Sequence, residues 1–225
     1  MLNRRVGVLA GLLAIACLLA TPAWAGSRAC GAAPYSYAGF QGARHATSVS
    51  ATIGVRSAPQ VSSGHVMAWV GVGGPGEGPR GTDEWLQVGI SAFPGSAPNV
   101  YYEVQKPDGT YRYIGVLGLL KPGEKHRVAI HETSRAGWWR VFVDGKRVSS
   151  SIHLPGSHGR WFGDAEAENW NGGHAACNHL DFSFEDIAVG ETSSLWSPLF
   201  TGRLLQDPGY RVIRGEPNAF VASSV

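Results

Sequence analysis

Hydrophobic residues in this chain alternate with polar ones in many short segments, and no stretch keeps the spacing of an amphipathic helix. Seven segments are rich in β-branched or aromatic residues and lie between Gly, Pro, Asn or Asp: 47–55, 65–72, 84–91, 99–104, 111–117, 126–132 and 138–145. Two further strand-like segments follow at 164–170 and 179–189. Short runs separated by turn residues indicate β-strands. We therefore predict an all-β fold, one antiparallel β-sandwich of the jelly-roll kind.

Turn residues mark the connections between these segments. The sequence VDGK at 143–146 predicts a hairpin, because Asp144 and Gly145 tolerate the positive φ angles that a tight turn needs. From about residue 190 the chain is interrupted by Pro and Gly, and we expect it to pack back as a strand or an extended tail.

The first 25 residues have the pattern of a secretory signal peptide. Arg4 and Arg5 precede the apolar run Val6–Ala20, and Ala23-Trp24-Ala25 provides a small-residue cleavage site. We expect cleavage to leave residues 26–225 as a single domain, secreted or periplasmic, and a monomer. Cys17 follows residues that fit a lipobox poorly, so we do not expect lipidation.

Charge and cysteine content restrict the partners of the mature chain. Without Arg4 and Arg5, the 19 Lys and Arg residues become 17, which equals the 17 Asp and Glu. A nucleic-acid-binding protein normally has a basic surplus, so we expect no nucleic acid partner. No second apolar run is long enough to cross a bilayer. Cys30 and Cys177 remain as a pair, for which we predict a disulfide in an oxidising compartment.

The segment EWLQVGIS at 84–91 has an unusual polar face. Alternation places Leu86, Val88 and Ile90 on one face of a strand, and Trp85 with Gln87 on the other. An aromatic ring beside a directional amide is typical of a ligand-binding face rather than of a solvated one.

Two other segments repeat this combination of aromatic and polar residues on one face. In DAEAENW, alternation places Glu166, Glu168 and Trp170 together, opposite two alanines. In YYEV, Tyr101 shares a face with Glu103. These side chains are candidates for a substrate groove.

Several common kinds of site are excluded. The string GVGGPG at 71–76 matches a dinucleotide-binding pattern, but Pro75 and the glycines around it prevent the helix that such a site needs. No G-x-S-x-G elbow and no H-E-x-x-H spacing occurs. We therefore predict no metal site and no cofactor.

The order of several motifs resembles the fungal glutamic peptidases called eqolisins. The motifs are YSYAGFQ (35–41), VSATIGV (49–55), AWVGVGG (68–74), WLQVGI (85–90), YYEV (101–104) and AEAENW (165–170). The resemblance covers roughly residues 35–189. It implies a concanavalin A-like jelly roll and a secreted peptide hydrolase with an acid pH optimum. The chain carries no N-x-S/T sequon, which is compatible with a bacterial relative.

Carried over by motif, the resemblance implies that Gln87 and Glu168 are the catalytic residues. Glu166, a neighbour on the same strand face, is the alternative base. The family's acidic residue after W-V-G corresponds to Gly73 here, and Asp83 or Glu84 are candidates to supply a carboxylate nearby. The substrate groove would be lined by tryptophans and by the candidates named above: Trp69, Trp85, Trp170, Glu166, Tyr101 and Glu103.

Two other functions fit the same sandwich. A lectin-like carbohydrate-binding module would use the tryptophans as platforms for sugar rings. A glycoside hydrolase would pair Glu168 with Glu103 or Glu166 across the groove. The group that faces Glu168 distinguishes the three functions. Gln87 within hydrogen-bond or one-water distance of Glu168 favours the peptidase, and a facing carboxylate favours the glycosidase. An open aromatic strip with neither group favours carbohydrate binding.

Overall fold

The computed structural model describes residues 30, 35–170, 177–192, 195–197, 202–215 and 217–225. The predicted signal peptide and Cys17 lie outside the described residues. Within them the only helical element is one short 3₁₀ turn, η1 (Pro79–Gly81), and no helix is long and apolar enough to cross a bilayer. The all-β prediction is confirmed.

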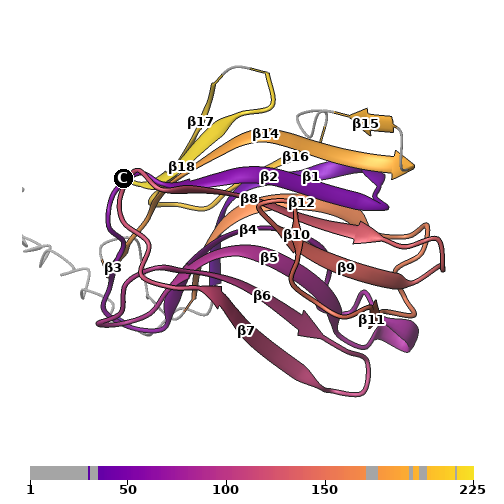
Figure 1. The fold of residues 1–225 in the computed structure, drawn as a ribbon. Helices are drawn as coiled ribbons and strands as arrows, with labels where there is room; N and C mark the ends of the chain where they lie inside the picture. The colour runs from indigo at the N-terminus through magenta and orange to yellow at the C-terminus, as the bar shows by residue number, and fades with distance from the viewer. Residues whose placement is uncertain (1–29, 31–34, 171–176, 193–194, 198–201, 216) are drawn as a thin grey trace, which may run out of the picture.

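Two antiparallel sheets pack face to face (Figure 1). The seven-stranded sheet has the spatial order β16 (Arg203–Gln206), β1 (Tyr35–His45), β12 (Phe162–Trp170), β4 (His65–Gly74), β5 (Glu84–Ala92), β6 (Asn99–Gln105) and β7 (Tyr111–Leu117). Strand β12 thus lies between β1 and β4, although more than 80 residues separate it from either in sequence.

The second sheet has nine strands. Its main path runs β10 (Lys146–Arg147), β9 (Trp138–Val143), β8 (Lys125–Glu132), β2 (Ser48–Val55), β14 (Asp181–Thr192), β18 (Phe220–Ser224) and β17 (Tyr210–Arg214). Two short strands pair beside this path, β11 (Ile152–His153) with β9 and β15 (Leu195–Ser197) with β14. A separate two-stranded ribbon joins β13 (Asn178–His179) to β3 (Gln60–Val61).

The predicted strand segments agree closely with the structure. All nine correspond to strands, namely β2, β4, β5, β6, β7, β8, β9, β12 and β14. Strand β9 ends at Val143, because Asp144 and Gly145 form the predicted turn with φ angles of 48° and 74°. The segment after residue 190 contributes β16 to one sheet and β17 and β18 to the other.

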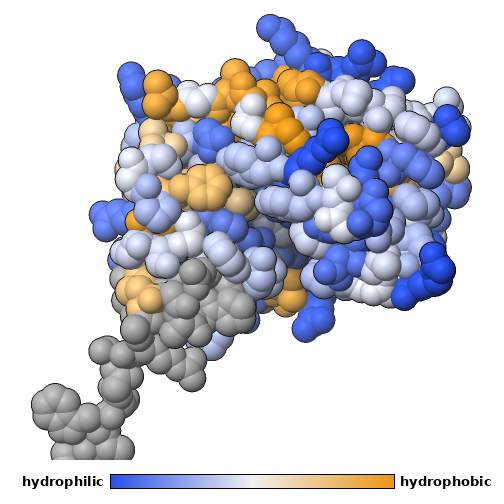
Figure 2. Space-filling model, turned by 90° about the horizontal axis from the view of Figure 1, so that it is seen from below, coloured by the Kyte–Doolittle hydropathy of each residue, from blue (hydrophilic) through white to orange (hydrophobic). Residues whose placement is uncertain are grey.

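The core lies between the two sheets and follows the predicted alternation. Leu86, Val88 and Ile90 of β5 are fully buried there, and Ala165 and Ala167 of β12 pack beside them. The opposite sheet contributes apolar side chains such as Val49, Ile53, Ile130, Phe182 and Phe184. Seen from below, the surface is mostly hydrophilic, with hydrophobic side chains gathered along one margin (Figure 2).

The predicted disulfide is present. Cys30 and Cys177 are joined with their Cα atoms 5.5 Å apart, across 147 residues of sequence. The bond ties the segment before β1 to the residue that precedes β13.

We expect reduction of this disulfide to lower the free energy of unfolding by up to about 5 kcal/mol, because a cross-link that closes so long a loop restricts the unfolded chain. Urea unfolding of the mature chain with and without dithiothreitol measures this difference. The double variant Cys30→Ser/Cys177→Ser is the control, and its stability should not respond to dithiothreitol. An equal stability of oxidised and reduced wild type would contradict the expectation.

Candidate functional site

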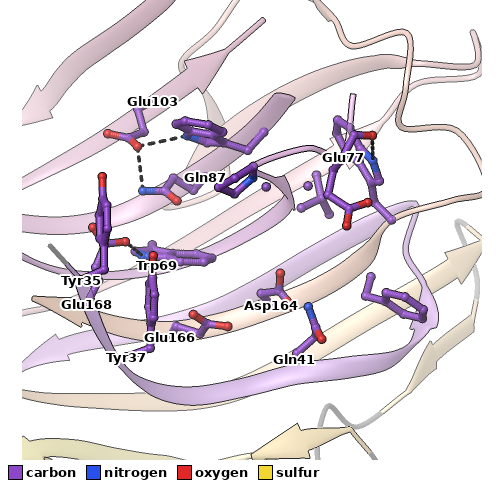
Figure 3. Close-up of a pocket in the computed structure, with 17 residues that line it drawn as sticks. Tyr35, Tyr37, Gln41, Trp69, Glu77, Gln87, Glu103, Asp164, Glu166 and Glu168 are labelled. Atoms are coloured by element: carbon purple, nitrogen blue, oxygen red, sulfur yellow. Dashed lines mark hydrogen bonds between the residues drawn. The ribbon is translucent and has the colours of Figure 1, made fainter. Parts of the chain in front are cut away.

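A pocket of about 330 Å³ lies on the outer face of the seven-stranded sheet, opposite the core (Figure 3). Its lining comes from β1, β4, β5, β6 and β12, together with the segments that lead into β5 and β12. The lining residues are Tyr35, Tyr37, Gln41, Trp69, Val72, Gly73, Gly74, Pro75, Glu77, Trp85, Gln87, Glu103, Trp161, Phe162, Asp164, Glu166 and Glu168.

Strand register places Gln87 in one row with a carboxyl on β12. Gln87 is paired with Gly71 of β4, and Gly71 is paired with Asp164 of β12. On the far side of Asp164 lies Gln41 of β1. Residues directly opposite each other on neighbouring strands point to the same face, so the row presents an amide, a gap and a carboxyl to the pocket.

Gly71 is required by the close packing within this row. A Cβ atom at Gly71 would lie 3.0 Å from the Gln87 Cβ and 3.0 Å from the edge of the Trp69 ring. Because no side chain stands at position 71, the Trp69 indole can extend along β4 between the two sides of the pocket. Figure 3 shows Gln87 on one side of this ring and Asp164, Glu166 and Gln41 on the other.

The Gln87 amide is held in place by two neighbours. Its Nε2 donates to the Tyr101 hydroxyl and to Oε1 of Glu103, each at 3.0 Å. Glu103 also accepts from the Trp85 indole at 3.2 Å and from the Tyr111 hydroxyl at 2.7 Å. Burial is the main cause that raises the pKa of Glu103, while the Tyr111 hydrogen bond opposes the rise.

Glu168 is engaged on both carboxyl oxygens. Oε1 lies 3.0 Å from Nε2 of His65, and Oε2 accepts from the Trp69 indole at 3.2 Å. The His65 ring in turn stacks on Trp170, with ring centroids 5.2 Å apart. Glu168 is therefore part of a hydrogen-bonded and aromatic cluster at one end of the pocket.

Asp164 and Glu166 are buried carboxyls in the middle of β12. Each is less than a tenth exposed, and burial raises the pKa of both well above the usual range. A hydrogen bond from Gln41 opposes the rise for Asp164, whereas the charges of Asp164 and Glu168 add to it for Glu166. Burial therefore favours the protonated form of both carboxyls.

The loop after β4 supplies a carboxyl, but not from the residues that the sequence suggested. Gly73 has a φ of +79°, and a Cβ there would lie 2.4 Å from the Glu84 carbonyl oxygen. An acidic side chain at this position would require the loop to rearrange. Asp83 is exposed and accepts from the Gly76 amide. Glu77 lines the pocket instead, with its carbonyl oxygen bound by the Trp161 indole.

Glu84 points away from the pocket. Its side chain shares the core face of β5 with Leu86 and is fully buried. Oε2 accepts from the Gly156 amide at 2.9 Å, and Oε1 has no hydrogen-bond partner in the described part of the chain. Burial raises the pKa of Glu84 to about 7.

The structure brings together most of the candidate residues chosen from sequence. Gln87, Glu166, Glu168, Glu103, Trp69 and Trp85 all line the pocket. Tyr101 is fully buried beneath Gln87, and Trp170 is 37% exposed beyond the lining.

Sequence reasoning missed Glu77, Asp164 and the lining side chains of Tyr35, Tyr37, Gln41, Trp161 and Phe162. For Asp164 a signal existed, because the alternation that paired Glu166 with Glu168 includes it. The other residues lie in segments whose position depends on tertiary structure.

The pocket is acidic. Five carboxyls line it, and none of its described lining residues is Lys or Arg. Across the described ranges, no three His, Cys, Asp or Glu side chains are arranged to hold a metal ion. The arrangement offers paired carboxyls for proton transfer and an amide donor beside aromatic surfaces.

No protein-family model and no curated protein matches the sequence. Among solved structures, the chain is similar in fold to scytalido-glutamic peptidase with a transition-state analogue inhibitor (TM-score 0.59) and with a peptide-based transition-state analogue (TM-score 0.58). It is also similar to SCP-B, a member of the eqolisin family, in complex with the tripeptide Ala-Ile-His (TM-score 0.54). Each is 17% identical and covers 85% of this chain and 98% of the other. The predicted resemblance in fold is confirmed.

We expect the protein to lose stability as the pH rises from about 4.5 to about 7. The pKa of Glu84 is raised from 4.5 to about 7 on folding, so the folded state holds a proton that the unfolded state releases in this range. Glu103, Asp164 and Glu166, whose pKa values are also raised, act in the same direction. Urea unfolding at pH 4 and pH 8 measures the loss.

The variant Glu84→Gln isolates the contribution of Glu84 to the pH dependence of stability. We expect this variant to lose about 3 kcal/mol less than wild type between pH 4 and pH 8, because the amide has no proton to release. Glu124→Gln, at an exposed position, is the matched control and should follow wild type. A Glu84→Gln variant with the same pH dependence as wild type would refute the assignment.

Proposed function

We propose that the protein is a hydrolase that cleaves peptide bonds by activating a water molecule between the Gln87 amide and a carboxyl of β12. The observation that carries this proposal is the placement of an amide and acidic side chains on opposite sides of the Trp69 ring in one pocket (Figure 3). A facing amide is the feature that distinguishes this mechanism from a pair of carboxylates acting on a glycosidic bond.

Peptide hydrolysis requires a general base, a hydrogen-bond donor to the oxyanion, and a general acid. An ionised carboxyl takes a proton from water as the water oxygen attacks the peptide carbonyl carbon. The Gln87 N–H donates to the oxyanion that forms, and the carboxyl returns its proton to the leaving nitrogen as the C–N bond breaks. The sequence proposes Glu168 as this base, with Glu166 as the alternative.

Acidic conditions favour release of the Gln87 amide from its hydrogen bond with Glu103. Both of its N–H groups are directed at Tyr101 and Glu103, so a substrate oxyanion must compete with Glu103 for one of them. Burial raises the pKa of Glu103, and its neutral form is a weaker acceptor than the carboxylate. Protonation of Glu103 therefore makes an amide hydrogen available.

The charge of the pocket bears on the substrate. Five carboxyls without a basic residue in the lining would repel an anionic chain at neutral pH. A polypeptide is neutral along its backbone and accepts and donates hydrogen bonds along its length. The fold similarity to peptidases supports a polypeptide substrate.

We also propose that the mature chain, residues 26–225, is secreted and acts as a monomeric single domain. The disulfide between Cys30 and Cys177 is compatible with an oxidising compartment. We propose no nucleic acid partner, no membrane association after signal removal, and no cofactor.

We expect purified residues 26–225 to hydrolyse a denatured protein substrate at acid pH. Gln87→Ala should lower kcat by about 10²- to 10³-fold, which is typical of the loss of one oxyanion donor. Gln60→Ala, at an exposed position in β3, is the matched control. Product formation from pH 3 to pH 7 is measured, with circular dichroism to verify folding. Absence of cleavage at every pH would exclude the peptidase.

Binding of neutral glycans is a second candidate, favoured by an aromatic surface at one end of the pocket. Tyr35 is 50% exposed and Trp170 is 37% exposed, and their ring centroids are 6.3 Å apart. Exposed aromatic rings beside polar groups suit the apolar faces of sugar rings.

If this candidate is correct, titration calorimetry with neutral oligosaccharides will detect binding, and Trp170→Ala will weaken it at least about tenfold, which corresponds to ~1.4 kcal/mol. Trp138→Ala, on the other sheet, is the matched control. Equal affinity of the two variants would exclude a sugar platform at Trp170.

A further inference from the structure

We infer that Asp164, rather than Glu168 or Glu166, is the general base that faces Gln87. This inference rests on the proposed peptide hydrolysis and assigns one of its residues. It is carried by the row Gln87–Gly71–Asp164, in which the only residue between the amide and the carboxyl has no side chain.

The register separates the three carboxyls of β12 by their distance from Gln87. Asp164 is in the same row, two strand spacings away, or roughly 10 Å at the backbone. Glu166 pairs with Trp69, two residues further along β4, and Glu168 pairs with Met67, four residues further. At ~3.3 Å per residue, Glu168 lies roughly 16 Å from Gln87 at the backbone.

The indole of Trp69 adds to this separation. It donates to Glu168 at one end and reaches Gly71 with its ring edge at the other. A peptide group bound over Gly71 would therefore lie beside Asp164, at the ring edge of the indole. The Glu168 carboxyl is at the opposite end of the ring.

The hydrogen-bond pattern also distinguishes the carboxyls. Oδ1 of Asp164 is buried and has no hydrogen-bond partner among the described residues, while the side chain lines the pocket. Both oxygens of Glu168 are occupied by His65 and Trp69. An unpartnered buried carboxyl oxygen is costly, and a water molecule or a substrate group would satisfy it.

The neighbours of Asp164 act on its protonation in opposite directions. Gln41 is paired with it on β1 and opposes the rise of its pKa, which favours the carboxylate. Glu166 is next on the same face, and the charge of Asp164 adds to the rise of the Glu166 pKa. The other carboxyl that acts on Asp164 is Glu77, from the loop after β4.

In the resulting step, Asp164 accepts one proton from water while the water oxygen bonds to the peptide carbon. The carbonyl electron pair moves to the oxygen, to which Gln87 donates. Collapse of the intermediate breaks the C–N bond, and Asp164 transfers its proton to the amine. A carboxylic acid and an amine leave, and Asp164 is again a carboxylate.

The test measures kcat and KM of the mature chain and of its variants Asp164→Asn, Glu166→Gln and Glu168→Gln. Each is measured over a series from acid to neutral pH. We expect Asp164→Asn to lower kcat by at least about 10²-fold with little change in KM, as expected for loss of a general base. Its loss should exceed those of the other two variants at least tenfold. Asp108→Asn, in the exposed turn after β6, makes the same chemical change and should behave as wild type.

A stability measurement separates this role from a structural one. Removing a buried carboxyl of raised pKa should stabilise the fold at pH 8, so Asp164→Asn should unfold at a higher urea concentration than wild type while it loses activity. If Asp164→Asn loses stability together with kcat, the inference is overturned.

The remaining outcomes are equally decisive. If Asp164→Asn stays active while Glu168→Gln or Glu166→Gln is inactive, the peptidase stands and the assignment of Asp164 is wrong. If wild type cleaves no peptide at any pH, the proposed function and this inference fail together.

Discussion

The pocket depends on the register of β12 between β1 and β4. Side chains alternate along a strand, so a shift of one residue would turn Ala165 and Ala167 toward the pocket and drive three carboxyls into the core. Burial of an unpaired carboxylate is far more costly than burial of a methyl group. The apolar partners of the two alanines therefore hold the acidic side chains of this strand in the pocket.

The same register places Asp164 and Glu166 as buried acids in a pocket whose described lining contains no Lys or Arg. These two carboxyls share a sheet face with the Trp69 ring, and their pKa values rise because burial excludes water. Both lower stability at neutral pH, and both place a titratable group in the pocket. Such a trade of stability for reactivity is common at functional sites.

Neighbouring side chains on β5 and β6 fix the orientation of the Gln87 amide. Tyr101 lies beneath it and Glu103 beside it, and both accept hydrogen bonds from its Nε2. Their own positions are set by pairing between β5 and β6, which aligns Glu103 with Gln87 and Tyr101 with Gly89. The amide is thus oriented by the sheet rather than by a flexible loop, which favours a defined geometry in the pocket.

The sequence by itself determined the strands, the faces of β5 and β12, and the Cys30–Cys177 pairing. These follow from local alternation, turn residues and a choice of two cysteines. Only the tertiary structure decided that Asp164 lies in one row with Gln87, that Glu77 lines the pocket, and that Glu84 is turned to the core. Alternation specifies the face on which a residue lies, but which residues meet across neighbouring strands depends on the packing of segments far apart in sequence.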